Sequence, residues 1–178
     1  MATAPDTLRT ARLVLRRPQL ADVDAVWAYA SDPRVTRYMS WPTHTDRAET
    51  LAWFGGVVAG WDQGTGEMYL VCDPASGEVL GAAGCHRGTA YRAVLGYVYR
   101  PEAWGRGVAT EACTALVALA RTQGYARVEA GCHADHTASA RVLEKSGLVF
   151  EGILRSYLVF PNLDPVHPAD LRMYGLAL

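Results

Sequence analysis

The segment Tyr99–Ala112 constrains the fold of this chain more than any other part of it. A β-type run over 94–99 ends here, a proline-containing turn follows, and two glycines flank Arg106 before a helical pattern begins. Glycine lets the backbone approach a ligand closely, and the first N–H groups of a helix have no intrahelical partner. Those donors and the positive end of the helix dipole favour a phosphate or pyrophosphate. The segment therefore predicts an anion cradle, although the glycines alone also fit an ordinary strand-to-helix connection.

Hydrophobic periodicity predicts a mixed sheet around this segment. Helices are expected at 20–30, 46–61 with Thr45 as its cap, 108 up to Gly124, and 137–146. Strands are expected at 13–16, 67–72, 78–86, 93–99, 125–132, 148–154 and 171–176, with an irregular, proline-bearing loop over 161–168 between the last two. The strand–helix–strand unit over 94–132 implies two parallel strands joined by a right-handed crossover, with helices on both faces of the sheet.

Composition excludes several classes of protein. The chain has 178 residues, half of them apolar and a fifth charged, which predicts one domain over 1–178. A formal net charge of −1 gives no reason to expect nucleic acid or a membrane surface as a partner. No apolar run approaches the roughly 20 residues of a membrane helix, and the N-terminus lacks a signal-peptide pattern. Four cysteines without close pairing are expected to be reduced, mostly buried thiols of a cytoplasmic protein, and no metal site is expected.

Two motifs together resemble a known family. Trp104–Ala109 after one strand and His136–Gly147 after the next resemble the GNAT superfamily of acyl-CoA N-acyltransferases. Leu13–Pro18, Ser31–Val35 and the Gly96-Tyr97 pair are similar to its RimJ/RimL-like branch, the ribosomal-protein N-terminal acetyltransferases. The resemblance covers roughly 8–176. It implies an α/β fold of the α+β type, a single-domain, mostly antiparallel twisted sheet with a central parallel β-α-β unit, and acetyl-CoA as cofactor.

The resemblance also implies which residues hold the cofactor. In this family the pyrophosphate lies on backbone amides of the glycine turn, and the pantetheine arm enters a gap where the preceding strand parts from its parallel neighbour. The matching positions in this chain are Tyr97, Val98, Tyr99, Trp104, Gly105, Arg106, Gly107, Val108, Ala109, Thr110, His136 and Ser139. Trp104 stands where the family usually has Gln or Arg. For Arg106 two roles are equally expected: a positive charge beside a phosphate, and a solvated surface arginine. The N–H of Val98 is expected near the acetyl carbonyl, where it can stabilise an oxyanion.

Ser139 and His136 are the catalytic candidates. Ser139 matches a serine that the family places near the CoA sulfur, although a serine in a first helical turn can also simply bond backbone amides. His136 replaces the usual asparagine of that motif, and either it or His133 is a candidate base. The glutamate and tyrosine that other relatives use are replaced by Val94 and Leu143. Deprotonation through water, with no dedicated base, therefore remains open.

Further candidates on the acceptor side are weaker. Cys132 as a nucleophile would give a ping-pong route, but a buried strand thiol is the simpler interpretation. Glu151, Asp170 and His44 are possible acceptor contacts, and the segment 160–169 is expected to influence specificity. Some of the aromatic residues in and after the early helices are expected to line an apolar acceptor pocket, and the others to be core: Trp27, Tyr29, Tyr38, Trp41 and Trp53.

The sequence therefore predicts an N-acetyltransferase. The acetyl group is expected to pass directly, in a ternary complex, to a primary amine of a small molecule or of a peptide or protein N-terminus, in a monomer or homodimer. The alternative is a catalytically silent acyl-CoA sensor, since Val94 and Leu143 replace catalytic residues of relatives. A third hypothesis is a nucleotide-binding P-loop protein, but the sequence argues against it because no Gly-Lys-Ser/Thr follows the glycines.

Overall fold

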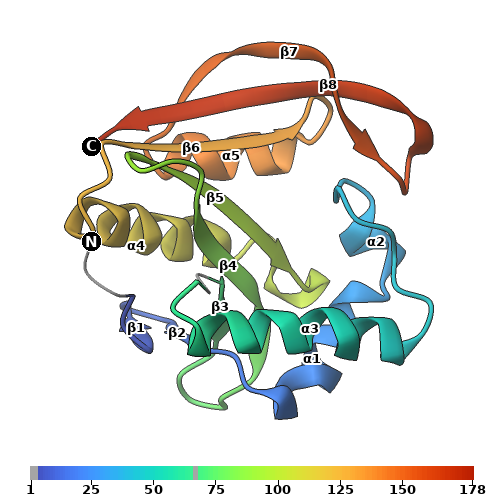
Figure 1. Cartoon of the computed structure of the whole chain (residues 1–178), viewed down its shortest axis with the longest axis vertical. Coiled ribbons are helices and arrows are strands. Elements are labelled where there is room, and N and C mark those ends of the chain that lie inside the picture. Colours follow the sequence, from blue (N-terminus) through green and yellow to red (C-terminus); the bar gives the residue numbers. More distant parts are fainter. Residues whose placement is uncertain (1–3, 66–67) are drawn as a thin grey trace.

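The computed structural model describes residues 4–65 and 68–178 (Figure 1). The strands are β1 (Thr7–Arg9), β2 (Val14–Arg16), β3 (Met68–Cys72), β4 (Val79–Arg87), β5 (Arg92–Tyr99), β6 (Arg127–His133), β7 (Val149–Phe160) and β8 (Asp164–Ala177). The helices are η1 (Leu20–Asp22), α1 (Val23–Ala30), α2 (Pro33–Thr36), α3 (Arg47–Asp62), η2 (Pro101–Ala103), α4 (Val108–Thr122) and α5 (Thr137–Lys145). None of the helices in the described ranges is both long and apolar enough to cross a membrane.

Within the described residues the strands form one eight-stranded sheet in the order β1-β2-β3-β4-β5-β6-β8-β7. Every neighbouring pair is antiparallel except β5 and β6, which are parallel and joined through α4. The predicted mixed, mostly antiparallel sheet with a central β-α-β unit is thus confirmed.

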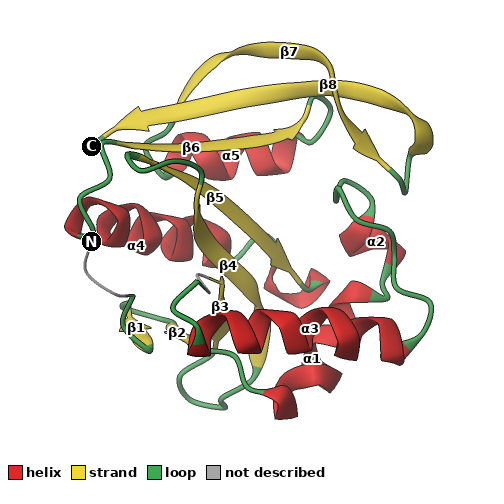
Figure 2. Ribbon diagram, viewed as in Figure 1, coloured by secondary structure: helices red, strands yellow, loops and turns green. Residues whose placement is uncertain are grey.

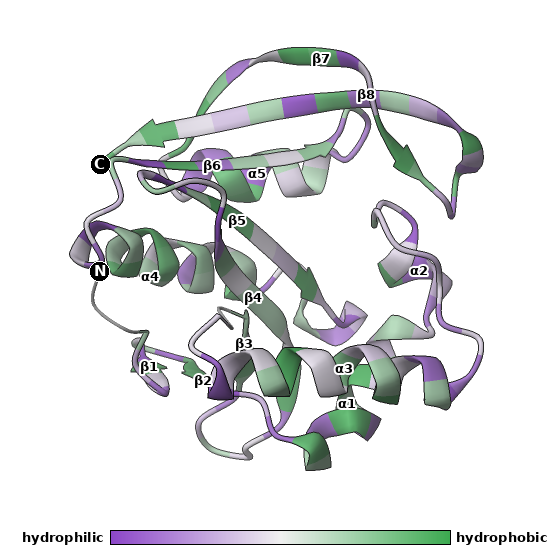
Figure 3. Cartoon of the chain, viewed as in Figure 1, coloured by the Kyte–Doolittle hydropathy of each residue, from purple (hydrophilic) through white to green (hydrophobic). Residues whose placement is uncertain are grey.

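Helices cover both faces of the sheet (Figure 2). Tyr69 and Val71 of β3 point into a core formed with α4 and α5, whereas Leu70 and Cys72 point into a core formed with α1 and α3. Because strand side chains alternate, a strand buried on both faces is apolar at nearly every position. Figure 3 shows this in β4 and β5, while hydrophilic residues gather at the start of α3. The four cysteines are buried and unpaired, as expected.

The sheet opens between β5 and β6. Only three residue pairs join these strands, and the last of them is Val94 with Glu129. On its other side β5 pairs with β4 all the way to Tyr99. The segment 95–99 therefore has a backbone edge toward β6 without a strand partner among the described residues. This is the gap predicted by the family resemblance.

The prediction of a loop over the whole of 161–168 is wrong, because the loop is shorter in the structure. The structure has a short turn at 161–163, and β8 begins at Asp164 and pairs with β7 as a long hairpin. Pro165 and Pro168 made this segment read as a loop. They lie beyond Leu171, where the pairing of β8 with β6 ends, so the segment has a strand partner on one side only. A proline, which lacks an N–H donor, is tolerated at such an edge.

Two details of the helices also differ from the prediction. The carboxylate of Asp46, not Thr45, caps α3 by accepting from the N–H of Ala48 at 2.8 Å. Thr45 instead donates its own N–H to Glu49 at 2.9 Å. The predicted start of the third strand at Glu67 lies outside the described residues.

Candidate active site

A cleft of about 1320 Å³ extends from the gap between β5 and β6. One wall comes from the N-terminus of α4 and from α5, and the opposite wall from α3 and the 38–41 segment that follows α2. Of the predicted site residues, all but Arg106 line it. The sequence therefore located the cleft from two short motifs.

The glycine turn presents free backbone donors to this cleft. Gly105 and Gly107 have φ of +71° and +76°, the left-handed region that glycine adopts without a steric penalty. Gly107 is the N-cap of α4, and the first helical hydrogen bond runs from Glu111 N–H to its carbonyl at 3.0 Å. The N–H groups of Val108, Ala109 and Thr110 have no acceptor among the described residues. Three converging amides at a helix N-terminus fit a diphosphate.

Glu111 and Arg12 brace the turn from behind. The Glu111 carboxylate accepts from the hydroxyl of Thr10 at 2.6 Å and from the backbone N–H and guanidinium of Arg12 at 2.8 Å each. Burial favours a raised pKa for Glu111, but these hydrogen bonds outweigh it and hold the pKa below its ordinary value. Arg12 also donates to the carbonyl of Arg106 at 3.1 Å. The turn is thus fixed before any ligand arrives.

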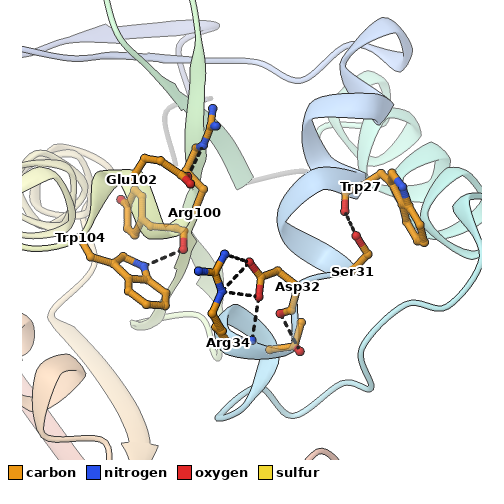
Figure 4. Close-up of polar contacts among 9 residues, drawn as sticks. Trp27, Ser31, Asp32, Arg34, Arg100, Glu102 and Trp104 are labelled. Carbon is orange, nitrogen blue, oxygen red and sulfur yellow. Dashed lines mark hydrogen bonds and ion pairs between the residues drawn. The ribbon is translucent and has the colours of Figure 1, made fainter.

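Trp104 lines the cleft and also anchors the end of β5 through its indole N–H. Its indole N–H donates to the carbonyl of Tyr99 at 2.8 Å, at the end of β5 (Figure 4). Facing it at the start of α2, Arg34 pairs with Asp32 through a contact of 2.6 Å. The guanidinium of Arg106 points away, donating to the carbonyl of Glu102 at 3.2 Å. Arg106 therefore contributes only its backbone to the turn, which agrees with the alternative that its side chain is a surface arginine.

Ser139 is buried and its hydroxyl bonds a side chain. Its Oγ lies 2.7 Å from the hydroxyl of Tyr97, which also donates to the Ser139 carbonyl at 3.1 Å. Burial raises the pKa of Tyr97, so this hydroxyl stays protonated. Burial likewise raises the pKa of Cys132, which argues against a thiolate nucleophile. The interpretation of Ser139 as a backbone-capping residue does not apply, since no bond joins its hydroxyl to an amide among the described residues.

Only one of the two candidate histidines lines the cleft, although both rings pack against Tyr38. His136 lines the cleft and stacks on Tyr38 with ring centroids 4.6 Å apart and planes 22° apart. Burial, and then the neighbouring His133, lower the pKa of His136. His133 does not line the cleft; its ring packs edge-on against Phe160, and its Nδ1 accepts from the N–H of Asp135 at 3.1 Å.

Sequence reasoning missed His86. This residue of β4 is directly opposite Val94 of β5 and lines the cleft. A Cβ placed on Gly96 would lie 4.0 Å from its Nε2. Desolvation lowers the pKa of His86. No local signal marks it, because its place depends on the pairing register of β4 and β5.

The early aromatic residues divide between core and cleft. Tyr29 is buried, whereas Tyr38, Trp41 and Trp53 line the cleft together with Phe160 of the β7–β8 hairpin. His44 packs between the rings of Trp41 and Trp53 and does not itself line the cleft.

The hairpin tip holds the 36–43 segment through a single side chain. Asn162 accepts from the N–H and the hydroxyl of Thr43, at 2.8 and 3.0 Å. Its amide group donates to the carbonyls of Thr36 and Trp41, at 2.7 and 2.9 Å. Both donors and both acceptor positions of the amide are used. Asn162 therefore fixes the wall that carries Tyr38 and Trp41.

The carboxylates proposed near the acceptor lie elsewhere. Glu151 pairs with Arg127, and Asp170 pairs with Arg155 at 2.5 Å. Neither lines the cleft. Asp135 is the only carboxylate among the described residues that do.

Comparisons with known proteins agree with this geometry. A family model described as an acetyltransferase (GNAT) domain matches residues 12–149. An uncharacterised N-acetyltransferase of Bacillus licheniformis is 31% identical over 155 residues, which is 85% of this chain and 87% of that protein.

Solved structures share the fold at lower identity. The microcin C7 self-immunity acetyltransferase, solved with acetyl-CoA and AMP, has a TM-score of 0.85 at 14% identity and covers 99% of this chain and 98% of its own. RimL, a ribosomal L7/L12 alpha-N-protein acetyltransferase solved with coenzyme A, has a TM-score of 0.82 at 22% identity, with 97% and 98% covered. Because the family model matches 12–149 and the Bacillus licheniformis relative is 31% identical over most of both chains, the chain belongs to the GNAT family of acetyltransferases, which use acetyl-CoA as the acetyl donor.

Proposed function

We propose that residues 1–178 act as one domain that transfers an acetyl group directly from acetyl-CoA to the primary amine of a small molecule or short peptide. The observation that carries this proposal is the single cleft that joins three free helix amides to an open strand edge. The thioester supplies an activated acyl group. The four buried, unpaired cysteines support a reducing, cytoplasmic location.

The residues have separate roles in this proposal. The amides of Val108, Ala109 and Thr110 hold the diphosphate, and the free edge of 97–99 pairs with the amide groups of the pantetheine arm. Gly105 and Gly107 allow the close approach, and Trp104 fixes the end of β5. The alternation along β5 turns the N–H of Val98 toward Ala82 of β4, as it does for Arg100, so the open edge carries the N–H groups of Tyr97 and Tyr99 instead. In this proposal one of these donors stabilises the negative charge that develops on the acyl oxygen.

The lining of the cleft favours a particular class of amine. Asp135 is the only carboxylate among the described lining residues, whereas Arg34, Arg141 and Lys145 bring positive charge. A polyamine or a polycationic antibiotic requires several carboxylates for recognition. The aromatic walls instead suit an amine with one ammonium group and an apolar body. We therefore infer a monoamine acceptor.

An acceptor screen tests the proposed function. The protein is incubated with acetyl-CoA and matched amines, for example phenethylamine beside spermidine, while free thiol and the mass of the acceptor are measured. We expect acetylation of apolar monoamines and little of the polyamine. Binding of acetyl-CoA by calorimetry without turnover on any amine would instead favour a silent acyl-CoA sensor.

Replacing Ser139 by alanine is expected to lower kcat by about 10- to 100-fold while the dissociation constant of CoA changes less than about threefold. The reason is that a donor to the leaving sulfur acts on the reaction more than on binding. Tyr97→Phe is the matched variant, since it keeps the ring and removes the hydroxyl bonded to Ser139. An unchanged kcat in Ser139→Ala would remove this serine from the mechanism.

A further inference from the structure

We propose that His86 is the general base that takes the proton from the acceptor ammonium group. This rests on the proposed function and assigns a catalytic role that the missing glutamate at Val94 left open. The argument has three parts: the two faces of β5, the position of His86 on one of them, and the chemistry of the other groups in the cleft.

The two faces of β5 serve the two substrates. Tyr97 and Tyr99 point toward α4 and α5, where the amide cradle lies. Val98 points to the opposite face, where it packs with α3 residues. Gly96, two residues from Val98, is on that same face. Since the acetyl donor, acetyl-CoA, is held on the α4 side, the α3 side with its aromatic wall is left for the acceptor amine.

His86 lies on the acceptor face, at the mouth of the opening. It is opposite Val94, the last β5 residue that pairs with β6. Its Nε2 points toward Gly96, whose missing side chain leaves the imidazole open to the cleft. The base that relatives carry at the Val94 position is thus replaced by a side chain on the neighbouring strand.

Other titratable groups in the cleft are less suited to this role. Cys132 and Tyr97 have raised pKa values because they are buried, so they hold their protons at neutral pH. His136, at the start of α5, stacks on Tyr38 of the acceptor wall and is the alternative base that the test below separates from His86. Asp135 lies beside it in the same connection. Among the described lining residues, His86 is therefore the neutral base that the sheet itself presents on the acceptor face.

The electrostatic surroundings favour the neutral imidazole. The charged groups that the strand register places on the same face are Arg92 of β5 and Arg127 and Glu129 of β6. Glu129 pairs with Arg92 at 3.3 Å and with Arg127 at 3.2 Å. Desolvation lowers the pKa of His86. An imidazole with a lowered pKa is unprotonated at pH 7 and can accept a proton.

The proton balance is simple. A primary ammonium group loses two protons as the new N–C bond forms and the C–S bond breaks. His86 accepts the first through Nε2 and releases it to solvent at the open cleft. The second ends on the leaving sulfur, so His86 returns to its neutral state after each turnover.

The test is the pH dependence of kcat/KM for an acetylated monoamine at saturating acetyl-CoA. In the native protein log kcat/KM is expected to rise with a slope of one below the pKa of His86 and to level off between that pKa and the pKa of the amine, because neutral imidazole takes the proton from the bound ammonium group. His86→Gln is expected to lose about 100-fold at pH 7 and to keep a slope of one throughout. Added imidazole is expected to restore part of the rate in His86→Ala.

Two further measurements make the outcome decisive. NMR titration of the free protein is expected to give His86 a pKa below 6.5, and calorimetry is expected to show unchanged acetyl-CoA binding in His86→Gln. A rate within threefold of native and an unchanged pH profile in His86→Gln would overturn the proposal, as would the loss of the plateau in His136→Gln instead. If the native protein acetylates no amine, the proposed function itself fails.

Discussion

Replacing Gly107 by alanine is expected to weaken acetyl-CoA binding by about 10- to 100-fold. Gly107 has φ of +76°, and a non-glycine residue held there costs about 1–3 kcal/mol. The added Cβ would also lie 3.3 Å from Nη2 of Arg12, which braces the turn. The turn must shift, and it carries the amides of Val108–Thr110 with it. Calorimetric titration with acetyl-CoA measures the effect directly.

Gly77→Ala is the matched control. Gly77 has φ of +73° in the exposed turn between β3 and β4, and a Cβ there would meet no atom within 4 Å. Both variants are expected to lose thermal stability, because both place alanine at a similar positive φ. Only Gly107→Ala is expected to lose affinity. Equal acetyl-CoA affinity in the two variants would mean that this turn does not hold the cofactor.

Replacing Asn162 by alanine is expected to raise the acceptor KM by about tenfold or more, with acetyl-CoA affinity within about twofold of native. The substitution removes four hydrogen bonds and leaves the carbonyls of Thr36 and Trp41 without their partner. An unsatisfied buried polar group costs about 1–3 kcal/mol, so the 36–43 segment is expected to loosen. Steady-state kinetics with each substrate varied in turn separates the two effects.

Leu163→Ala is the control for the Asn162 variant. Leu163 is in the same turn, is 41% exposed and does not line the cleft. Its substitution is expected to leave both Michaelis constants close to native. An acceptor KM unchanged in Asn162→Ala, with only the thermal midpoint lowered, would limit Asn162 to a structural role.

Local sequence patterns were sufficient to place the glycine turn at the N-terminus of α4. The strand, the glycine turn and the amphipathic helix are neighbours along the chain, so Gly105–Thr110 could be assigned before the fold was known. The cap of α3 was misplaced by one residue, since Thr45 and Asp46 are both good N-cap residues and only the geometry selects Asp46.

The acceptor side depends on contacts between distant segments. Asn162 bonds residues 119 to 126 positions away, and no periodicity in the sequence indicates such a pairing. His86 gains its position from the register of two strands. Pro165 and Pro168 suggested a loop because single-sequence reasoning does not show which strands lack a neighbour on one side. Only tertiary packing determines that Tyr29 is buried in the core whereas Tyr38 is not.

The three-pair junction between β5 and β6 has a mechanical consequence. Between the long central strands β4, β5, β6 and β8, the β5–β6 junction has the fewest residue pairs, so strands β1–β5 and β6–β8 are joined there only by a short ladder and by α4. A ligand that forms hydrogen bonds along the open edge of β5 replaces the backbone contacts that are missing between β5 and β6. Ligand binding in the cleft is then expected to stiffen the whole protein, and amide hydrogen exchange is expected to slow in both parts of the sheet together.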